Sequence, residues 1–174
     1  MEIRKATAAD LDGVEAIYNA VLDHQAATVN YTNWEKGSYP TRATAEKALA
    51  EGTLYVQSDG DALVGCAVFN HEQLPEYANI DWLYPAEGDQ VMVIHTLCIH
   101  PAASGRGLAK ALVAYAEQLG RAQGCTVMRF DTYEGNLPAR ALYTGLGYRL
   151  AGSADFHFED VIDEVLVCYE KELL

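Results

Sequence analysis

A glycine-rich turn between an apolar strand pattern and a helical pattern is the part of this chain best suited to hold a phosphate group. The strand pattern is His95-Thr96-Leu97-Cys98-Ile99-His100-Pro101, and the turn is Ser104-Gly105-Arg106-Gly107-Leu108-Ala109. A strand that breaks into such a turn and opens a helix leaves several backbone N–H groups unpaired and pointing one way, where the helix dipole also favours negative charge. The spacing therefore predicts a cradle for a pyrophosphate.

A second block of residues strengthens this interpretation. A single Gly-x-Gly is weak evidence, because glycine at such a place can also serve only to bring a helix close to a sheet. The second block follows a strand-like run from Val127 to Thr132 and reads Asn136-Leu137-Pro138-Ala139-Arg140-Ala141-Leu142-Tyr143-Thr144-Gly145-Leu146-Gly147-Tyr148. The two segments together favour a coenzyme site over a purely structural role for the glycines.

Both segments resemble those of the GNAT family of N-acetyltransferases. That family has an Arg/Gln-x-x-Gly-x-Gly/Ala turn that binds phosphate and a downstream Asn-x-Pro-Ala…Leu-Tyr…Leu-Gly-Phe/Tyr block. Ser104 stands where the family usually has Arg or Gln, but backbone amides make most phosphate contacts in such a turn. The resemblance spans nearly the whole chain, and it implies acetyl transfer from acetyl-coenzyme A (acetyl-CoA) to an amine.

The resemblance also implies which residues bind acetyl-CoA. The turn would hold the pyrophosphate, backbone groups of Leu97 and Ile99 would pair with the pantetheine arm, and Asn136 would contact that arm further along. The full set of expected coenzyme-binding residues is Leu97, Cys98, Ile99, Ser104, Gly105, Arg106, Gly107, Leu108, Ala109, Asn136, Ala139 and Arg140. We expect no metal ion in the site.

Tyr143 stands where the family places the acid that protonates the leaving thiolate. A phenol has a pKa near 10 and an ordinary thiol one near 8.5, so proton donation from tyrosine costs about 2 kcal/mol before any tuning. The alternative is that Tyr143 is a core tyrosine on an amphipathic helix.

His95 is the candidate base. At pH 7.5 a lysine-like amine is neutral only about once in 800 molecules, equivalent to about 4 kcal/mol, so a group that removes the proton is useful. A neutral imidazole is competent near pH 7. His95 lies two residues before Leu97, whose backbone N–H in this family would polarise the thioester carbonyl. The segment also resembles the central strand of arylalkylamine N-acetyltransferases, which have a second histidine where this chain has Val93.

Other assignments of the base stay open at this point. A histidine in the middle of a strand is often a hydrogen-bonded structural residue, and we expect this of His100 beside Pro101. A carboxylate acting through water is the remaining choice; the weaker alternatives to His95 are His71, Glu72 and Asp81.

The charge distribution bears on the acceptor. The net charge is −13, which argues against nucleic-acid binding. No Lys or Arg occurs from Ala48 to Gly105, whereas eight acids do: Glu51, Asp59, Asp61, Glu72, Glu76, Asp81, Glu87 and Asp89. Such a stretch can simply be solvated acidic loops. Because the segment from Ser104 to Arg149 is instead positive, the asymmetry also fits an anionic coenzyme and a small cationic amine as substrate.

Composition limits the cellular setting. The 174 residues are 50% hydrophobic, which suits one globular domain. No apolar run approaches the roughly 18 residues of a membrane span, and the first residues lack a signal-peptide layout, so we expect a cytoplasmic protein without a membrane partner. The cysteines, Cys66, Cys98, Cys125 and Cys168, contain no Cys-x-x-Cys pair, which favours buried reduced thiols over disulfides or zinc. A homodimer is one of the oligomeric states left open.

The pattern of apolar residues and caps predicts an α/β protein in which a central mixed β-sheet is flanked by helices. The expected order is β-α-α-β-β-β-α-β-α-β-β, which matches the GNAT acyl-CoA N-acyltransferase fold as a single domain over residues 1–174. Strands are expected at residues 2–6, 53–58, 62–71, 91–99, 127–132, 149–153 and 164–170, and helices after Thr7 and at 41–51, 107–122 and 138–144. We expect residues 25–40 to border the acceptor site, and Tyr77, Trp82 and Tyr84 to anchor their loop rather than line the pocket.

Two other functions remain compatible with the sequence. One keeps the fold but acetylates protein or peptide N-termini or lysines. The other is a regulatory domain that binds acyl-CoA without turnover, although the presence of Asn136 and Tyr143 argues against it. The sequence does not identify the amine acceptor or the pathway.

Overall fold

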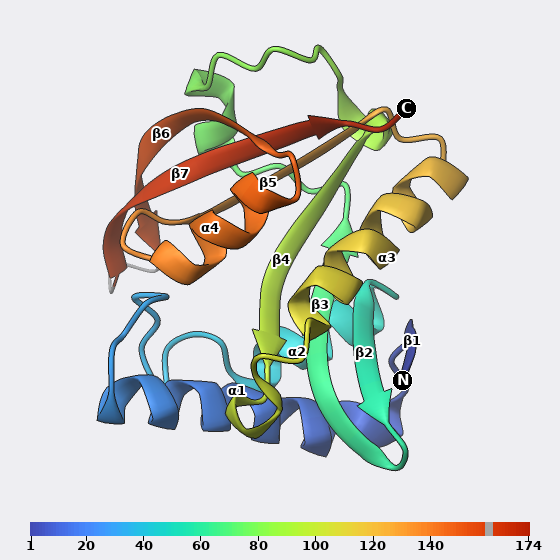
Figure 1. Ribbon diagram of the computed structural model, residues 1–174, viewed down its shortest axis with the longest axis vertical. Helices are drawn as coiled ribbons and strands as arrows, with labels where there is room; N and C mark the ends of the chain where they lie inside the picture. Colours follow the sequence, from blue (N-terminus) through green and yellow to red (C-terminus); the bar gives the residue numbers. More distant parts are fainter. Residues whose placement is uncertain (159–161) are drawn as a thin grey trace. The chain divides into compact units, whose positions relative to one another are not determined.

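The computed structural model describes residues 1–158 and 162–174, which form a seven-stranded mixed sheet in the order β1-β2-β3-β4-β5-β7-β6 (Figure 1). β4 and β5 pair in parallel, whereas β1–β2, β2–β3, β5–β7 and β6–β7 pair in antiparallel fashion. The strands are β1 (Glu2–Lys5), β2 (Leu54–Asp59), β3 (Ala62–Asn70), β4 (Val91–Ile99), β5 (Val127–Tyr133), β6 (Arg149–Phe158) and β7 (Ile162–Glu172).

Four α-helices are present in the described part of the chain: α1 (Leu11–Ala27), α2 (Arg42–Ala50), α3 (Leu108–Ala122) and α4 (Leu137–Gly145). The predicted order of strands and helices is confirmed, and most boundaries lie within one residue of those expected. The two last strands are longer than predicted, and a single 3-10 turn (Ala8–Asp10) precedes α1.

The caps explain why the first helices start where they do. The backbone N–H of Thr7 donates to Asp10 Oδ2 at 2.7 Å, in a capping box that opens the 3-10 turn before α1. Arg4 donates two further hydrogen bonds to the same carboxylate. These contacts, with that of Arg4 the largest, lower the pKa of Asp10 to about 2. Thr41 caps α2, and Gly52 follows that helix at a φ of +69°.

The chain divides into two compact units, and the first comprises residues 1–30, 34–69 and 94–115. Its core packs one face of α1, including Val14, Ile17 and Tyr18, against β2 and β3 residues such as Val56 and Cys66. This is the amphipathic pattern that the helical spacing predicts.

The second unit comprises residues 31–33, 70–93 and 116–174. β5 lies between β4 and β7 in the sheet, with the ladder from β4 running from Val91↔Val127 to Val93↔Arg129. Four aromatic rings cluster in this unit, with Phe130 at centroid distances of 4.3 to 6.2 Å from the other three: Tyr143, Tyr148 and Tyr169. Since the chain divides into these two units, the expectation that residues 1–174 form a single domain stays a prediction.

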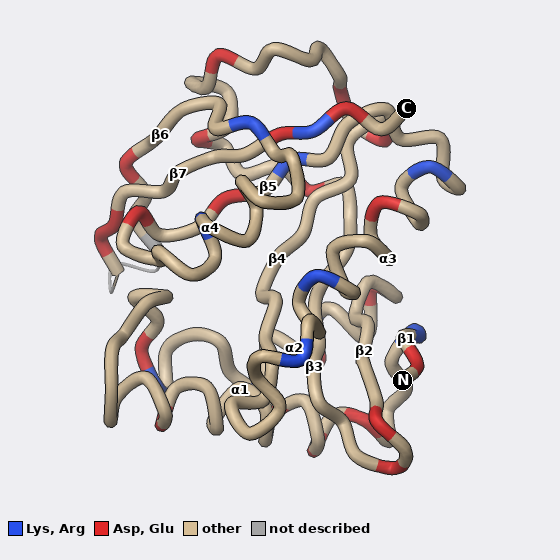
Figure 2. Tube along the Cα trace, in the orientation of Figure 1, with Lys and Arg blue, Asp and Glu red and all other residues tan. Residues whose placement is uncertain are grey.

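The irregular segment between β3 and β4 is anchored within the second unit. Glu170 of β7 is fully buried and accepts hydrogen bonds from the backbone N–H groups of Leu83 and Tyr84. The Arg129 guanidinium lies 4.4 Å from the centre of the Trp82 ring and donates to the Tyr84 carbonyl. Trp82 and Tyr84 therefore anchor the loop, as expected. Figure 2 shows acidic residues and no basic residue along this segment.

All four cysteines are buried and free, as predicted. Among the residues that the structure describes, no helix is long and apolar enough to cross a membrane. No group of three or more His, Cys, Asp or Glu side chains in that part of the chain could hold a metal ion.

Candidate active site

β4 contains a backbone distortion next to the candidate base. Thr96 has a φ of +50°, although it is β-branched and lies inside a strand. A non-glycine residue held in the left-handed region costs on the order of 1–3 kcal/mol and tends to occur at functional sites. The Thr96 hydroxyl is hydrogen-bonded to the hydroxyl of Tyr39, which comes from the loop expected to border the acceptor site. The distortion falls between His95 and Leu97, the two β4 residues with predicted chemical roles.

The glycine turn is open to the outside. Gly105 and Gly107 have φ values of +77° and +75°, and a Cβ added to either would meet no atom within 4 Å. Packing of helix against sheet therefore does not explain these glycines, whereas the left-handed conformation does. Ala103 and Leu108 are buried beside Val64 on either side of the turn. The turn is thus a fixed and exposed loop at the start of α3, which fits a pyrophosphate.

The Arg106 side chain forms an ion pair with Asp59, within the first unit. Its guanidinium donates to Asp59 Oδ2 at 2.7 Å, and both side chains are 45% exposed. This contact lowers the pKa of the Asp59 carboxyl. An exposed ion pair of this kind contributes little stability, so Arg106 can exchange Asp59 for a phosphate oxygen at small cost. Its place in the coenzyme site stays a prediction.

The histidines differ in their surroundings. His95 is half-buried in β4. His100 Nδ1 accepts a hydrogen bond from the backbone N–H of Ala102 at 3.2 Å, which caps the short turn after β4 and is a structural role, as expected. His71 bonds through Nδ1 to the Val91 carbonyl at 2.8 Å. Glu72 and Asp81 are exposed.

Cys98 contributes a side chain to the protein core. It is 2% exposed and packs in the cluster around α1. A hydrogen bond with Cys66 and burial hold its pKa well above the usual value. Only the backbone of Cys98 is therefore suited to the coenzyme contact that the sequence predicts for it.

The polar residues of the second block hold α4 in place. Asn136 is the N-cap of α4, where Oδ1 accepts from the backbone N–H of Ala139 at 3.3 Å and Nδ2 donates to Thr132 Oγ1 at 3.0 Å. Arg140 donates to the carbonyl oxygen of Glu134 at 2.8 Å. Direct contacts of Asn136, Ala139 and Arg140 with coenzyme stay predictions beside these structural roles.

Tyr143 lies on α4 with its ring in the aromatic cluster of the second unit. It is 7% exposed, and no described residue hydrogen-bonds to its hydroxyl. Burial first, and then the negative charge of Asp131, raise the pKa of Tyr143. The phenol is consequently protonated at neutral pH and can act as a proton donor.

Asp131, Glu164 and Glu76 are three carboxylates of the second unit that were not among the predicted site residues. Asp131 accepts a hydrogen bond from the Tyr77 hydroxyl at 2.6 Å, and burial raises the pKa of Asp131 to about 6. Burial likewise raises the pKa of Glu164 to about 7. Glu76 Oε2 is buried and has no hydrogen-bond partner among the described residues. The only signal in the sequence is one acid within the apolar strand pattern of β5.

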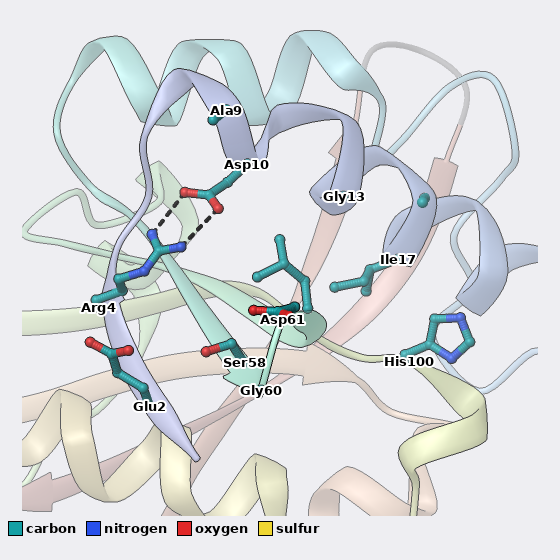
Figure 3. Close-up of a pocket in the computed structure, with 12 residues that line it drawn as sticks. Glu2, Arg4, Ala9, Asp10, Gly13, Ile17, Ser58, Gly60, Asp61 and His100 are labelled. Carbon is teal, nitrogen blue, oxygen red and sulfur yellow. Dashed lines mark hydrogen bonds and ion pairs between the residues drawn. The ribbon is translucent and has the colours of Figure 1, made fainter.

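A separate cavity of about 640 Å³ lies in the first unit (Figure 3). It has an apolar wall that includes Ile17 and a charged wall where Arg4 pairs with Asp10. His100 lies at its edge. None of the residues that line it is a predicted coenzyme or catalytic residue.

The sequence from residue 14 to residue 148 matches the acetyltransferase (GNAT) family. The chain belongs to this family. It is an acetyl-CoA-dependent N-acetyltransferase with the mixed sheet and flanking helices of GNAT structures.

Known proteins agree with this assignment. An L-methionine sulfoximine/L-methionine sulfone acetyltransferase of Pseudomonas paraeruginosa is 27% identical over 150 residues, which are 86% of this chain and 81% of that protein. A GNAT-family acetyltransferase of Streptococcus agalactiae superimposes with a TM-score of 0.80 at 23% identity, covering 98% of this chain and 94% of that one. The yncA protein of Salmonella typhimurium, solved with its cofactor acetyl-CoA, superimposes with a TM-score of 0.68 at 22% identity, covering 99% and 93%.

Proposed function

We propose that this GNAT enzyme transfers the acetyl group of acetyl-CoA to the primary amine of a small cationic molecule. The Pseudomonas relatives are named for L-methionine sulfoximine and L-methionine sulfone, amino-acid derivatives whose α-amino group is largely an ammonium ion at neutral pH. The acid-rich stretch from Ala48 to Gly105 would attract the ammonium group of an acceptor, although these two amino-acid derivatives also carry an α-carboxylate and have no net positive charge. The observation that carries the catalytic part is Tyr143, a buried, protonated phenol without a hydrogen-bond partner among the described residues.

Acetyl-CoA, when bound, supplies a thioester acetyl group. The exposed left-handed glycines of the turn would hold the pyrophosphate through their backbone N–H groups. The backbone of Leu97 and Ile99 would hold the pantetheine arm, and the Leu97 N–H would polarise the thioester carbonyl. The distortion at Thr96 supports this role, because it breaks the regular strand geometry just before Leu97.

His95 and Tyr143 would move the two protons of the reaction. His95 takes a proton from the acceptor ammonium, directly or through water, and the freed nitrogen attacks the carbonyl carbon. A C–N bond would form and the C–S bond would break as Tyr143 gives its proton to the departing sulfur; the second proton, which the nitrogen loses as the amide forms, would restore the Tyr143 hydroxyl directly or through water, and His95 would release its proton to solvent. The half-buried position of His95 beside the Thr96 distortion supports its assignment as the base.

A thiol-release assay with acetyl-CoA and a panel of primary amines tests the function. The panel includes L-methionine sulfone, L-methionine sulfoximine, small alkylamines and short peptides. We expect turnover with small cationic amines. Turnover confined to peptides, read by mass spectrometry, would replace the small-molecule acceptor, and no turnover with any amine would contradict the enzyme's proposed substrate class.

Tyr143→Phe tests the acid. The ring stays in the aromatic cluster while the proton is lost, so turnover should fall a hundredfold or more with coenzyme affinity near that of the wild type. Tyr148→Phe is the matched control, because Tyr148 is also buried in this cluster and its hydroxyl donates to Glu117 instead. Turnover of Tyr143→Phe within a few-fold of the control would remove the role.

A further inference from the structure

A pair of hydroxyl groups joins the loop before α2 to the second half of β4. The Tyr39 hydroxyl is hydrogen-bonded to the hydroxyl of Thr96, which lies 57 positions further along the chain, and both residues belong to the first unit. Thr96 is buried, so water has little access to replace this partner. The bond connects the loop expected to border the acceptor site with the strand expected to hold the thioester.

Two sets of contacts fix Tyr39 independently of Thr96. The backbone N–H of Tyr39 donates to the Glu35 carbonyl at 3.0 Å, in a turn in which Gly37 has a φ of +86°. The Tyr39 ring also meets the Trp34 ring edge-on with centroids 5.6 Å apart, and Trp34 packs against the core around α1. The Tyr39 hydroxyl is therefore a fixed point that can restrain a residue of β4.

The backbone conformation of Thr96 sets the direction of the next N–H group. A strand residue has a φ of about −120° to −140°, whereas Thr96 has a φ of +50°. A left-handed residue inside a strand turns the peptide groups on its two sides away from the direction they have in a regular ladder. The Leu97 N–H belongs to the peptide group that follows Thr96 and is the group expected to polarise the thioester carbonyl. Its direction depends on Thr96 staying left-handed.

A threonine keeps this conformation only where its surroundings enforce it, because the left-handed region is unfavourable for a β-branched residue. The described ladder between β4 and β5 ends at Val93↔Arg129, three residues before Thr96, so pairing with β5 does not supply the restraint. The Tyr39 hydroxyl does contact the Thr96 side chain. Glycine would adopt the conformation without help, so threonine at this position makes the geometry of β4 depend on a second residue.

We propose that Tyr39 is a positioning residue for acetyl transfer. Through the Thr96 hydroxyl it holds β4 in the distorted conformation that aims the Leu97 N–H at the thioester carbonyl. The inference rests on the proposed function for the role of Leu97, and it goes further by assigning a role to a tyrosine that acts through another residue.

NMR of the protein without ligands tests the restraint apart from catalysis. The coupling between the amide and α protons of Thr96, with its carbon chemical shifts, reports its φ. We expect a left-handed Thr96 in the wild type and an extended one in Tyr39→Phe, which keeps the ring beside Trp34 and loses only the hydroxyl. Tyr18→Phe is the matched control, because the Tyr18 hydroxyl is buried in the core around α1 without a hydrogen-bond partner among the described residues. A left-handed Thr96 in Tyr39→Phe would overturn the inference.

Single-turnover rates of acetyl transfer measure the consequence for catalysis. Loss of an oxyanion donor costs about 100- to 1,000-fold in rate, so loss of its positioning in Tyr39→Phe should cost about tenfold to a hundredfold. The affinity for acetyl-CoA should stay within about threefold, because the glycine turn is unchanged. The limb of the rate–pH profile assigned to His95 should also stay in place. An unchanged rate, or a limb that moves by a pH unit or more, would overturn the link to Leu97.

Thr96→Val completes a double-mutant cycle, because valine keeps the branched shape and lacks the hydroxyl. If Tyr39 acts through Thr96, Thr96→Val should lower the rate to a similar extent, and the double variant should be no more than about twofold slower than either single variant. Rate losses that multiply would overturn the inference. A circular dichroism melt of each variant shows that the comparison is made on folded protein.

The outcomes separate the inference from the proposed function. A Thr96 that becomes extended in Tyr39→Phe, in a protein whose wild type acetylates no amine, would uphold the hold of Tyr39 on Thr96 and overturn the function. Equal rates of acetyl transfer in the wild type and Tyr39→Phe would overturn the inference and leave the function standing.

Discussion

Replacing Asp131 by asparagine should make the protein more stable at neutral pH. The substitution keeps the side-chain shape and leaves an oxygen that can accept the hydrogen bond from Tyr77, but it removes a partly buried negative charge. Most substitutions of a buried, hydrogen-bonded residue destabilise a protein. The opposite expectation here comes from the missing counter-ion.

The magnitude follows from the pKa of Asp131, which rises from 3.8 to about 6 in the folded protein. One pKa unit corresponds to about 1.4 kcal/mol, so the ionised carboxylate costs about 3 kcal/mol above pH 6 relative to the unfolded chain. Below about pH 4 the group is neutral in both states and this cost is absent. Wild-type stability should therefore fall, relative to Asp131→Asn, as the pH rises from about 4 to about 6. Neutralising Asp131 also lowers the pKa of Glu164, which adds stability of the same sign.

Urea unfolding at several pH values between 4 and 8, followed by tryptophan fluorescence, measures this difference. Subtracting the wild-type free energy of unfolding from that of Asp131→Asn cancels groups that both proteins share, such as Asp10 with its pKa lowered to about 2. Glu134→Gln controls for the change in net charge at an exposed position. A free-energy difference that does not change with pH, or one that favours the wild type at pH 7, would refute the reasoning.

Gly107→Val should weaken acetyl-CoA binding at least tenfold in calorimetry, because a branched side chain at a φ of +75° strains the turn and occupies the space beside it. Gly124→Val, at a φ of +84° beyond the other end of α3, is the control. Equal affinities of the two variants for acetyl-CoA would contradict the placement of the coenzyme at the turn. In urea titrations, Asn136→Ala should lower the free energy of unfolding by about 1 kcal/mol through loss of the α4 cap, whereas Asn136→Asp should keep the wild-type stability. An Asn136→Ala variant as stable as the wild type would disprove the role of Asn136 as a cap. His95→Ala should abolish the limb of the rate–pH profile at about 6.5 to 7.5, and a retained limb would assign the base elsewhere.

Local rules account for what the sequence predicted well. Helix starts at Thr7 and Thr41 follow from side chains that can cap, and the glycine turn follows from residues that accept a left-handed backbone. The strand and helix order needed only apolar periodicity. The start of β7 was missed because the consecutive acids Asp163 and Glu164 break the alternation there, whereas the end of β6, residues 154–158, does alternate and carried a strand signal that the predicted bounds left out.

Contacts between distant segments account for what the sequence could not predict. The left-handed Thr96 accompanies a hydrogen bond to Tyr39, which is 57 positions away, and nothing in the strand pattern indicates it. In the sequence, Asp131 is a single acid near the end of a strand. Its surroundings in the fold include Tyr77, which is 54 positions earlier, and Cys168 in β7. A raised pKa is a property of the folded surroundings and not of the residue type.

Each unit carries one feature that lowers the stability of the folded protein. In the first unit a β-branched residue is held in a left-handed conformation directly between His95 and Leu97. In the second unit Asp131 and Glu164 form no ion pair with a described residue, and burial raises the pKa of both carboxyl groups. Glycine at position 96 would relieve the backbone strain, and asparagine at position 131 would remove the charge. Because the strain at Thr96 falls between two residues with predicted roles in acetyl transfer, it is better explained by binding of substrates than by folding, which gains nothing from it.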